Sequence, residues 1–99
     1  MNGGPSAIRR LCEALLLLED EQTAEKFLED LCTPAELSAL AERWRICRLL
    51  RDGRHSYREI YELTGVSTAT VTRVARCLRD PSGGGYRAIL EKIEKKEKS

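Results

Sequence analysis

Hydrophobic residues recur every three or four positions along most of the chain, which is the spacing of one face of an α-helix. No segment shows the strict alternation of apolar and polar residues that a β-strand requires. The pattern therefore predicts an all-α chain with six helices. Their expected ranges are about 7–18, 24–32, 34–52, 57–63, 68–78 and 86–96.

Capping residues indicate where these helices start. Thr33 and Ser56 each stand three residues before a glutamate, which is the spacing of a capping box, and Pro34 fits the first helical position, where its missing N–H costs nothing. Single capping hydroxyls are expected at Ser6, Thr23 and Ser67.

The apolar faces indicate what each helix buries. The first helix is apolar around more than the usual arc, so we expect more than one of its sides to be covered. In the third helix one face is expected to pack, with Ile46, Leu49 and Leu50 to its side. That face consists of Leu37, Leu40, Ala41, Trp44, Cys47 and Arg51. The inward stripe of the fifth helix consists of Val71, Val74, Ala75 and Leu78.

Chain length and composition suit one small globular domain over residues 1–99. The chain has 99 residues, of which 41% are hydrophobic and 33% charged, so it can bury a core, but only a small one. Dimerisation would relieve that shortage of buried surface. The apolar run at 15–18 is far too short to span a bilayer, so no membrane association is expected.

Charge is distributed unevenly, although the net charge is only +1. Residues 1–33 carry three basic and seven acidic groups, whereas residues 34–99 carry fourteen basic and nine acidic groups. Between Arg43 and Arg79 there are nine arginines and no lysine. Exclusive use of arginine suits planar recognition of phosphate or carboxylate, so the second part of the chain is the expected binding region.

Cysteine and histidine give no sign of catalysis or metal binding. The four cysteines, Cys12, Cys32, Cys47 and Cys77, match no metal or redox spacing and are expected to be small buried hydrophobes in a reducing cytoplasm. His55 stands alone and is expected to be a loop residue. We expect no enzyme activity and no cofactor.

Residues 56–78 predict a helix-turn-helix, in which the second helix enters a DNA major groove. Gly65 permits the positive φ of the turn, and short hydroxyls followed by arginines, without any acid, occupy the second helix. The expected DNA-contacting residues are Arg43, Tyr57, Arg58, Ser67, Thr68, Ala69, Thr70, Thr72, Arg73 and Arg76.

Two other interpretations remain open. The threonines of the second helix fit a solvent-facing surface as well, and Tyr57 fits a half-exposed packing position. The chain also fits a helical protein–protein interaction module that binds through the apolar first helix and the acidic residues 19–21. That module would be a monomer awaiting its partner.

The order and spacing of these motifs resemble the tryptophan repressor (TrpR) family, most closely its YerC/YecD-like branch. The resemblance runs without a gap from Thr33 to Leu78. It is carried by Thr33-Pro34, Arg43-Trp44-Arg45-Ile46, Leu49-Leu50-Arg51-Asp52-Gly53, Ser56-Tyr57-Arg58-Glu59 and Ala69-Thr70-Val71-Thr72-Arg73. It implies an intertwined six-helix homodimer in which each chain presents a helix-turn-helix to double-stranded DNA.

The resemblance also implies a co-repressor site for tryptophan, gripped by the residues at Thr33, Arg43 and Arg73. A glycine and a serine of the family's site are replaced here by Val74 and Cys77. Since Val74 takes up room and Cys77 is a weak partner for an ammonium group, we expect no tight tryptophan binding. The expected function is a sequence-specific DNA-binding transcriptional regulator without a small-molecule co-repressor, and a tryptophan-responsive repressor is the alternative.

Overall fold

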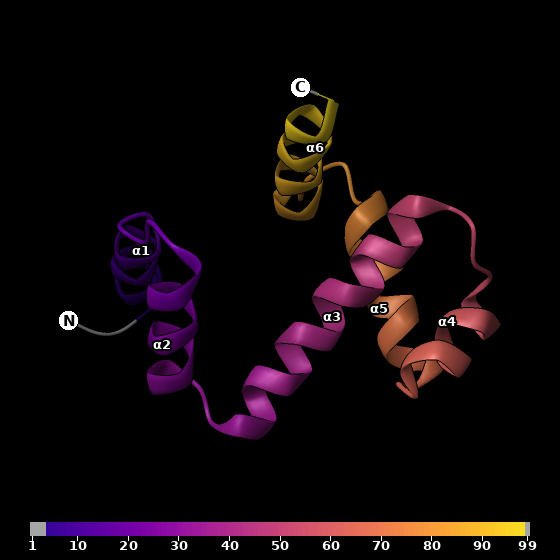
Figure 1. Ribbon diagram of the computed structural model, residues 1–99, viewed down its shortest axis with the longest axis horizontal. Helices are drawn as coiled ribbons and strands as arrows, with labels where there is room; N and C mark the ends of the chain where they lie inside the picture. The colour runs from indigo at the N-terminus through magenta and orange to yellow at the C-terminus, as the bar shows by residue number, and fades with distance from the viewer. Residues whose placement is uncertain (1–3, 99) are drawn as a thin grey trace. The chain divides into compact units, whose positions relative to one another are not determined.

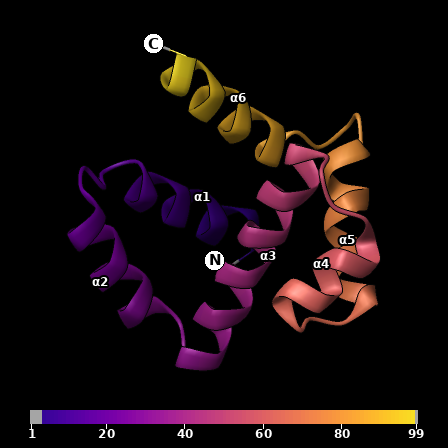
Figure 2. The same ribbon diagram turned by 45° about the vertical axis from the view of Figure 1, so that its right-hand side comes forward.

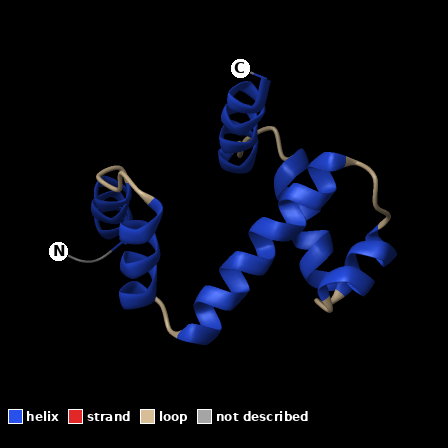
Figure 3. Ribbon diagram, in the orientation of Figure 1, coloured by secondary structure: helices blue, strands red, loops and turns tan. Residues whose placement is uncertain are grey.

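The structure, a computed structural model, describes residues 4–98. In that range the chain forms six α-helices and no strand, as predicted (Figures 1 and 3). The helices are α1 (Gly4–Leu15), α2 (Glu21–Leu31), α3 (Pro34–Asp52), α4 (Tyr57–Thr64), α5 (Thr68–Arg79) and α6 (Gly85–Lys98).

The chain divides into two compact units, Met1–Leu37 and Ser38–Ser99, and α3 passes from one into the other. The predicted single domain over residues 1–99 stays a prediction, and its residues 1–3 and 99 lie outside the described part of the chain. All buried side chains of the described residues belong to the second unit.

Both predicted capping boxes are confirmed. At the start of α3 the Thr33 N–H donates to Glu36 Oε1 at 2.8 Å, and the Glu36 N–H donates to Thr33 Oγ1 at 3.1 Å. At the start of α4 the Ser56 N–H donates to Glu59 Oε1 at 2.8 Å, and the Glu59 N–H donates to Ser56 Oγ at 3.1 Å. These local signals therefore set the starts of α3 and α4.

The first two helices differ from the prediction at their ends. Asp20, not Thr23, caps α2: its Oδ1 accepts the Thr23 N–H at 2.7 Å and its Oδ2 accepts the Thr23 hydroxyl at 3.1 Å. A carboxylate at this position also interacts favourably with the helix dipole, which explains why it is preferred over the threonine. The first helix begins before Ser6 and ends at Leu15, three residues earlier than expected.

The core of the second unit lies where α4, α5 and α6 meet the C-terminal half of α3 (Figures 1 and 2). Its buried side chains are Ile46, Cys47, Ile60, Val71, Val74, Ala75 and Leu90. Three members of the predicted α5 stripe are thus buried, and Leu78 packs against them half-buried.

The predicted packing face of α3 is only partly correct. Ile46, expected at the side, is fully buried, whereas Leu40 is 43% exposed and Ala41 is exposed. The reason is that within the second unit only the C-terminal half of α3 has helices to pack against, and they meet the side that carries Ile46 and Cys47.

Most of the cysteines are also more exposed than predicted. Cys47 alone among them is buried, and burial raises the pKa of its thiol. Cys32 is half-buried, while Cys12 and Cys77 are exposed. All four are free thiols.

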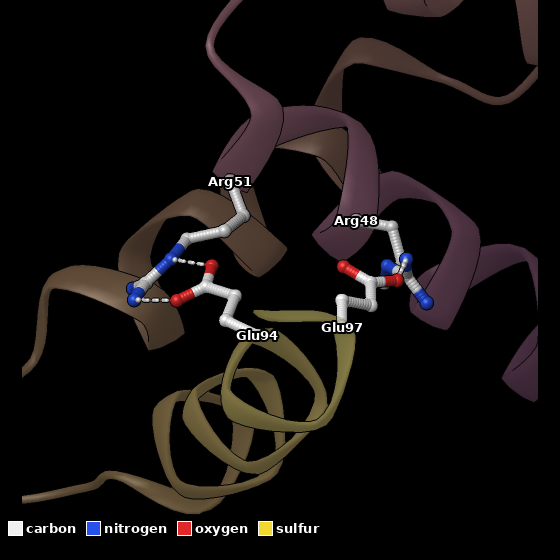
Figure 4. Close-up of polar contacts among 4 residues, drawn as sticks. All are labelled: Arg48, Arg51, Glu94 and Glu97. Atoms are coloured by element: carbon white, nitrogen blue, oxygen red, sulfur yellow. Dashed lines mark hydrogen bonds and ion pairs between the residues drawn. The ribbon is translucent and has the colours of Figure 1, made fainter. Parts of the chain in front are cut away.

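Helix α6 packs Leu90 into the core that α3 also lines. Two ion pairs also connect α6 with α3 (Figure 4). Arg51 holds Glu94 with two hydrogen bonds, from Nε at 2.9 Å and from Nη2 at 3.1 Å. Arg48 Nη2 lies 3.7 Å from Glu97 Oε2. The helix extends to Lys98, beyond its predicted end at residue 96.

Candidate nucleic-acid interface

The candidate interface is built on α4 and α5, which are joined by a three-residue turn at 65–67 (Figure 2). Ile60 of α4 and Val71 and Val74 of α5 are all buried in the core of the second unit. Since these side chains hold the two helices together, the outward face of α5 is presented on a fixed support.

Backbone geometry and side-chain hydrogen bonds fix the turn. Gly65 adopts φ +73°, as expected from the sequence, and its N–H donates to the Tyr61 carbonyl at 2.7 Å. The Thr64 hydroxyl donates to the Ile60 carbonyl at 2.8 Å and accepts the Val66 N–H at 3.3 Å. The turn is therefore specified by a glycine and a threonine, of which only the glycine carried a clear sequence signal.

Two of the four hydroxyls at the start of α5 are used inside the protein. Ser67 Oγ accepts the Thr70 N–H at 3.2 Å, which confirms Ser67 as the cap, and it lies 3.1 Å from Thr70 Oγ1. Thr70 is half-buried. These hydroxyls stabilise the helix start, so they are less available to a partner than the sequence suggested.

Three neighbouring side chains of α5 are exposed and are not used inside the protein. Thr68, Ala69 and Thr72 are exposed, and neither threonine hydroxyl forms a hydrogen bond within residues 4–98. This end of α5 thus offers a partner the hydroxyl and methyl groups of Thr68 and Thr72 and the methyl group of Ala69.

The arginines of α5 are also available. Arg73 and Arg76 are exposed, and neither forms an ion pair within the described range. The plain alternative for Arg76 is that it complements the helix dipole, since it lies in the last turn. On α4, Arg58 pairs with Glu62 at 3.6 Å, but its side chain is 86% exposed, and such a pair contributes only about 0–1 kcal/mol.

Tyr57 lies at the start of α4 and contacts the end of α5. Its hydroxyl accepts a hydrogen bond from Arg79 Nη1 at 3.3 Å, and the side chain is 42% exposed. Tyr57 therefore both packs within the motif and faces solvent, and both interpretations made from the sequence stay open.

Arg43 is half-buried on α3, and an aromatic pair that sequence reasoning did not connect with it lies nearby. The ring centroids of Trp44 and Tyr86 are 6.4 Å apart. Burial raises the pKa of the Tyr86 hydroxyl, and the charges of Arg43 and Arg73 oppose that rise. Tyr86 also packs against the core of the second unit.

The residues that the resemblance assigned to a ligand are not all in one unit. Thr33 belongs to the first unit, where its side chain caps α3. In the second unit Val74 is 1% exposed within the core, and Cys77 is exposed.

Metal binding and membrane insertion were considered for residues 4–98 as well. No group of histidine, cysteine and carboxylate side chains in that range is arranged to hold a metal ion. None of the described helices is both long enough and apolar enough to cross a bilayer.

Comparison with known sequences gives a consistent result. The Trp repressor protein family matches residues 6–94. The chain is 38% identical to YerC of Bacillus subtilis, over 89% of this chain and 83% of YerC. It is 36% identical to a Trp operon repressor homolog of Chlamydia trachomatis, over 81% of this chain and 88% of the homolog.

Comparison with solved structures agrees. A TrpR-like protein from Eubacterium eligens superposes with a TM-score of 0.81 at 38% identity, and 93% of each chain is covered. The likeness spans nearly all of both chains at 38% identity. This chain therefore belongs to the Trp repressor protein family, a family of regulators rather than enzymes.

Proposed function

We propose that this chain is a sequence-specific DNA-binding transcriptional regulator that acts as a homodimer and does not depend on tryptophan. The observation that carries the proposal is the outward face of α5, where Thr68, Ala69 and Thr72 are exposed beside the unpaired Arg73 and Arg76. No acidic residue stands between Gly65 and Arg79, so this face attracts a polyanion.

The proposed contacts to DNA are of two kinds, contacts to bases and contacts to phosphates. Threonine and alanine methyl groups suit the methyl of thymine, and free hydroxyls suit base edges or bridging waters in the major groove. The contacts to phosphate, which fix orientation rather than sequence, are assigned to Arg43, Arg58, Arg73 and Arg76. Ser67 acts mainly by capping α5, and the Thr70 hydroxyl lies 3.1 Å from its Oγ. The Trp repressor is itself one of the proteins on which this docking geometry is established.

The homodimer is supported by the first unit, in which no residue from 6 to 37 is buried. Ile8, Leu16 and Leu17 are 65%, 85% and 79% exposed. In aqueous solution, apolar surface of this kind is normally buried against a partner. The partner that the family resemblance implies is a second copy of the chain. In a dimer the two α5 helices would enter successive major grooves about 34 Å apart.

Independence from tryptophan is supported by the surroundings of Arg43 and Arg73. The branched side chain of Val74 fills space in the core, and Cys77 offers only a weak hydrogen-bonding thiol. A cytoplasmic location follows from a role in transcription and stays part of the proposal.

Selection of bound fragments from a pool of random DNA duplexes tests the proposal. We expect a two-fold symmetric motif with half-sites about one helical turn apart. The matched variants are Thr72→Val, which removes a free hydroxyl from the proposed reading face, and Ser38→Ala, which changes an exposed hydroxyl of α3 outside the motif. Recovery of no motif by the wild-type protein would favour the protein-interaction module instead.

A further inference from the structure

A pocket of about 390 Å³ lies between the end of α3, the loop before α4, the start of α4 and the second half of α5. Its apolar part is formed by Leu50, Ala75 and Leu78. The volume falls within the range of about 300–1,000 Å³ that is typical of small-molecule sites. None of the residues assigned above to tryptophan lines it.

The polar part of the pocket is positively charged. Arg51, His55, Tyr57 and Arg79 line it, and no carboxylate side chain does. An anion is therefore the complementary ligand, since it would meet the guanidinium group of Arg79 and the part of the Arg51 guanidinium that Glu94 does not hold.

Arg79 is the arginine best placed to accept a ligand. Its Nη1 donates to the Tyr57 hydroxyl at 3.3 Å, and it forms no ion pair within residues 4–98. Two nitrogens of Arg51, Nε and Nη2, already donate hydrogen bonds to Glu94. Its third nitrogen, Nη1, forms no hydrogen bond within residues 4–98. The two side chains leave several donors for one oxyanion.

We propose that this pocket binds a small organic anion, a carboxylate or phosphate carried on an apolar body. Arg79 and the Tyr57 hydroxyl hold the anionic group, and the apolar body rests on Leu50 and Leu78. An oxyanion alone would leave that apolar surface uncovered, which is why a purely inorganic ligand or a backbone phosphate of DNA fits less well.

Such a ligand would touch α3, the loop, α4 and α5 at once. It would therefore stabilise the orientation of the α4–α5 pair relative to the end of α3, whatever the protein binds with α5. The inference does not rest on the proposed DNA binding, and its test uses no DNA.

The experiment is a titration of the methyl-labelled full chain, followed by NMR, with three probes: 3-phenylpropionate, its neutral amide and inorganic phosphate. We expect 3-phenylpropionate to shift the methyl signals of Leu50, Ala75 and Leu78. The amide should bind about tenfold more weakly, because it lacks the charge-assisted hydrogen bonds. Arg79→Gln should weaken the carboxylate about five- to tenfold, whereas Arg76→Gln, an exposed arginine one turn earlier that does not line the pocket, should leave its affinity unchanged.

Equal binding of acid and amide, or equal effects of Arg79→Gln and Arg76→Gln, would overturn the proposal. Phosphate that binds as tightly as 3-phenylpropionate would replace the organic anion by a simple oxyanion and overturn it as well. Should Arg79→Gln fail to fold, Tyr57→Phe decides the matter: about threefold weaker binding supports the site, and unchanged binding refutes it.

Discussion

At the scale of single residues, the turn between α4 and α5 depends on Gly65. Its φ of +73° lies in the left-handed region, while a Cβ added there would meet no atom within 4 Å. Substitution at this position is therefore opposed by backbone strain and not by a clash. Gly85, at the start of α6, has equally open space and no such φ.

The pair Gly65→Ala and Gly85→Ala isolates this strain. We expect Gly65→Ala to lower the free energy of unfolding by about 1–2 kcal/mol. Gly85→Ala should leave it unchanged or raise it by up to about 1 kcal/mol, because alanine restricts the unfolded chain and favours the helix. Urea unfolding followed by circular dichroism measures both, and equal effects of the two variants would contradict the assignment.

Val74 and Cys77 predict how the protein responds to tryptophan. Val74 fills space and Cys77 pairs poorly with an ammonium group. Calorimetric titration with L-tryptophan should therefore show no micromolar binding. Cys77→Ser serves as the comparison, since a hydroxyl group pairs better with an ammonium group than a thiol does. A micromolar dissociation constant for the wild-type protein would refute the proposed independence from tryptophan.

At the scale of elements, the start of α4 is a reciprocal cap. The Ser56 backbone N–H donates to the Glu59 carboxylate and holds the pKa of that group below its ordinary value of 4.5. The deprotonated carboxylate is the form that the folded protein favours. Its contribution to stability is therefore complete above pH 4.5 and is lost as the pH falls through the lowered pKa of the folded state.

The capping carboxylate predicts a specific acid sensitivity. Between about pH 6 and about pH 3 the wild-type protein should lose more stability than Glu59→Gln, because glutamine keeps the capping geometry and does not titrate. Glu62→Gln, on the same helix but outside the capping box, is the control and should retain the wild-type loss. Chemical unfolding at a series of pH values provides the measurement. An identical pH profile for wild type and Glu59→Gln would show that the cap does not couple to protonation.

Local signals predicted the starts of α3, α4 and α5, because each is set by a side chain that is hydrogen-bonded to a backbone group three residues away. The start of α2 was missed although its signal is equally local: Asp20 and Thr23 are both good caps, and the sequence alone did not decide between them. The packing side of α3 was harder still. Ile46 is buried and Leu40 is exposed because the other helices contact α3 near Ile46. The periodicity of apolar residues does not indicate where another helix makes contact.

At the scale of the whole molecule, the exposed apolar residues of α1 and of the turn after it predict association. Light scattering at micromolar concentration should give about twice the monomer mass of 11.2 kDa. Leu17→Glu, at a position that is 79% exposed, should shift the protein toward the monomer, whereas Leu63→Glu, 51% exposed on α4, should not. A wild-type monomer would favour the protein-interaction module.

Arginine contacts to phosphate predict a steep salt dependence of DNA binding. Each phosphate contact adds a slope of about −0.9 in log affinity against log salt, so a dimer with several arginines per chain should give a slope of several units. Arg76→Gln should make the slope shallower by about two, one unit for each chain. Fluorescence anisotropy over a salt series measures it. Affinity that does not change with salt would exclude the proposed interface.

What the sequence determined by itself is the helical content, most helix starts, the Gly65 turn and the family, because these depend on short-range hydrogen bonds and on the order of motifs along the chain. Packing in three dimensions decided that Ile46 and not Leu40 is buried on α3, and that Arg79 and Leu50 line one pocket. Those facts depend on side chains distant in sequence being brought together, and burial against a particular neighbour leaves no periodic signal in a single chain.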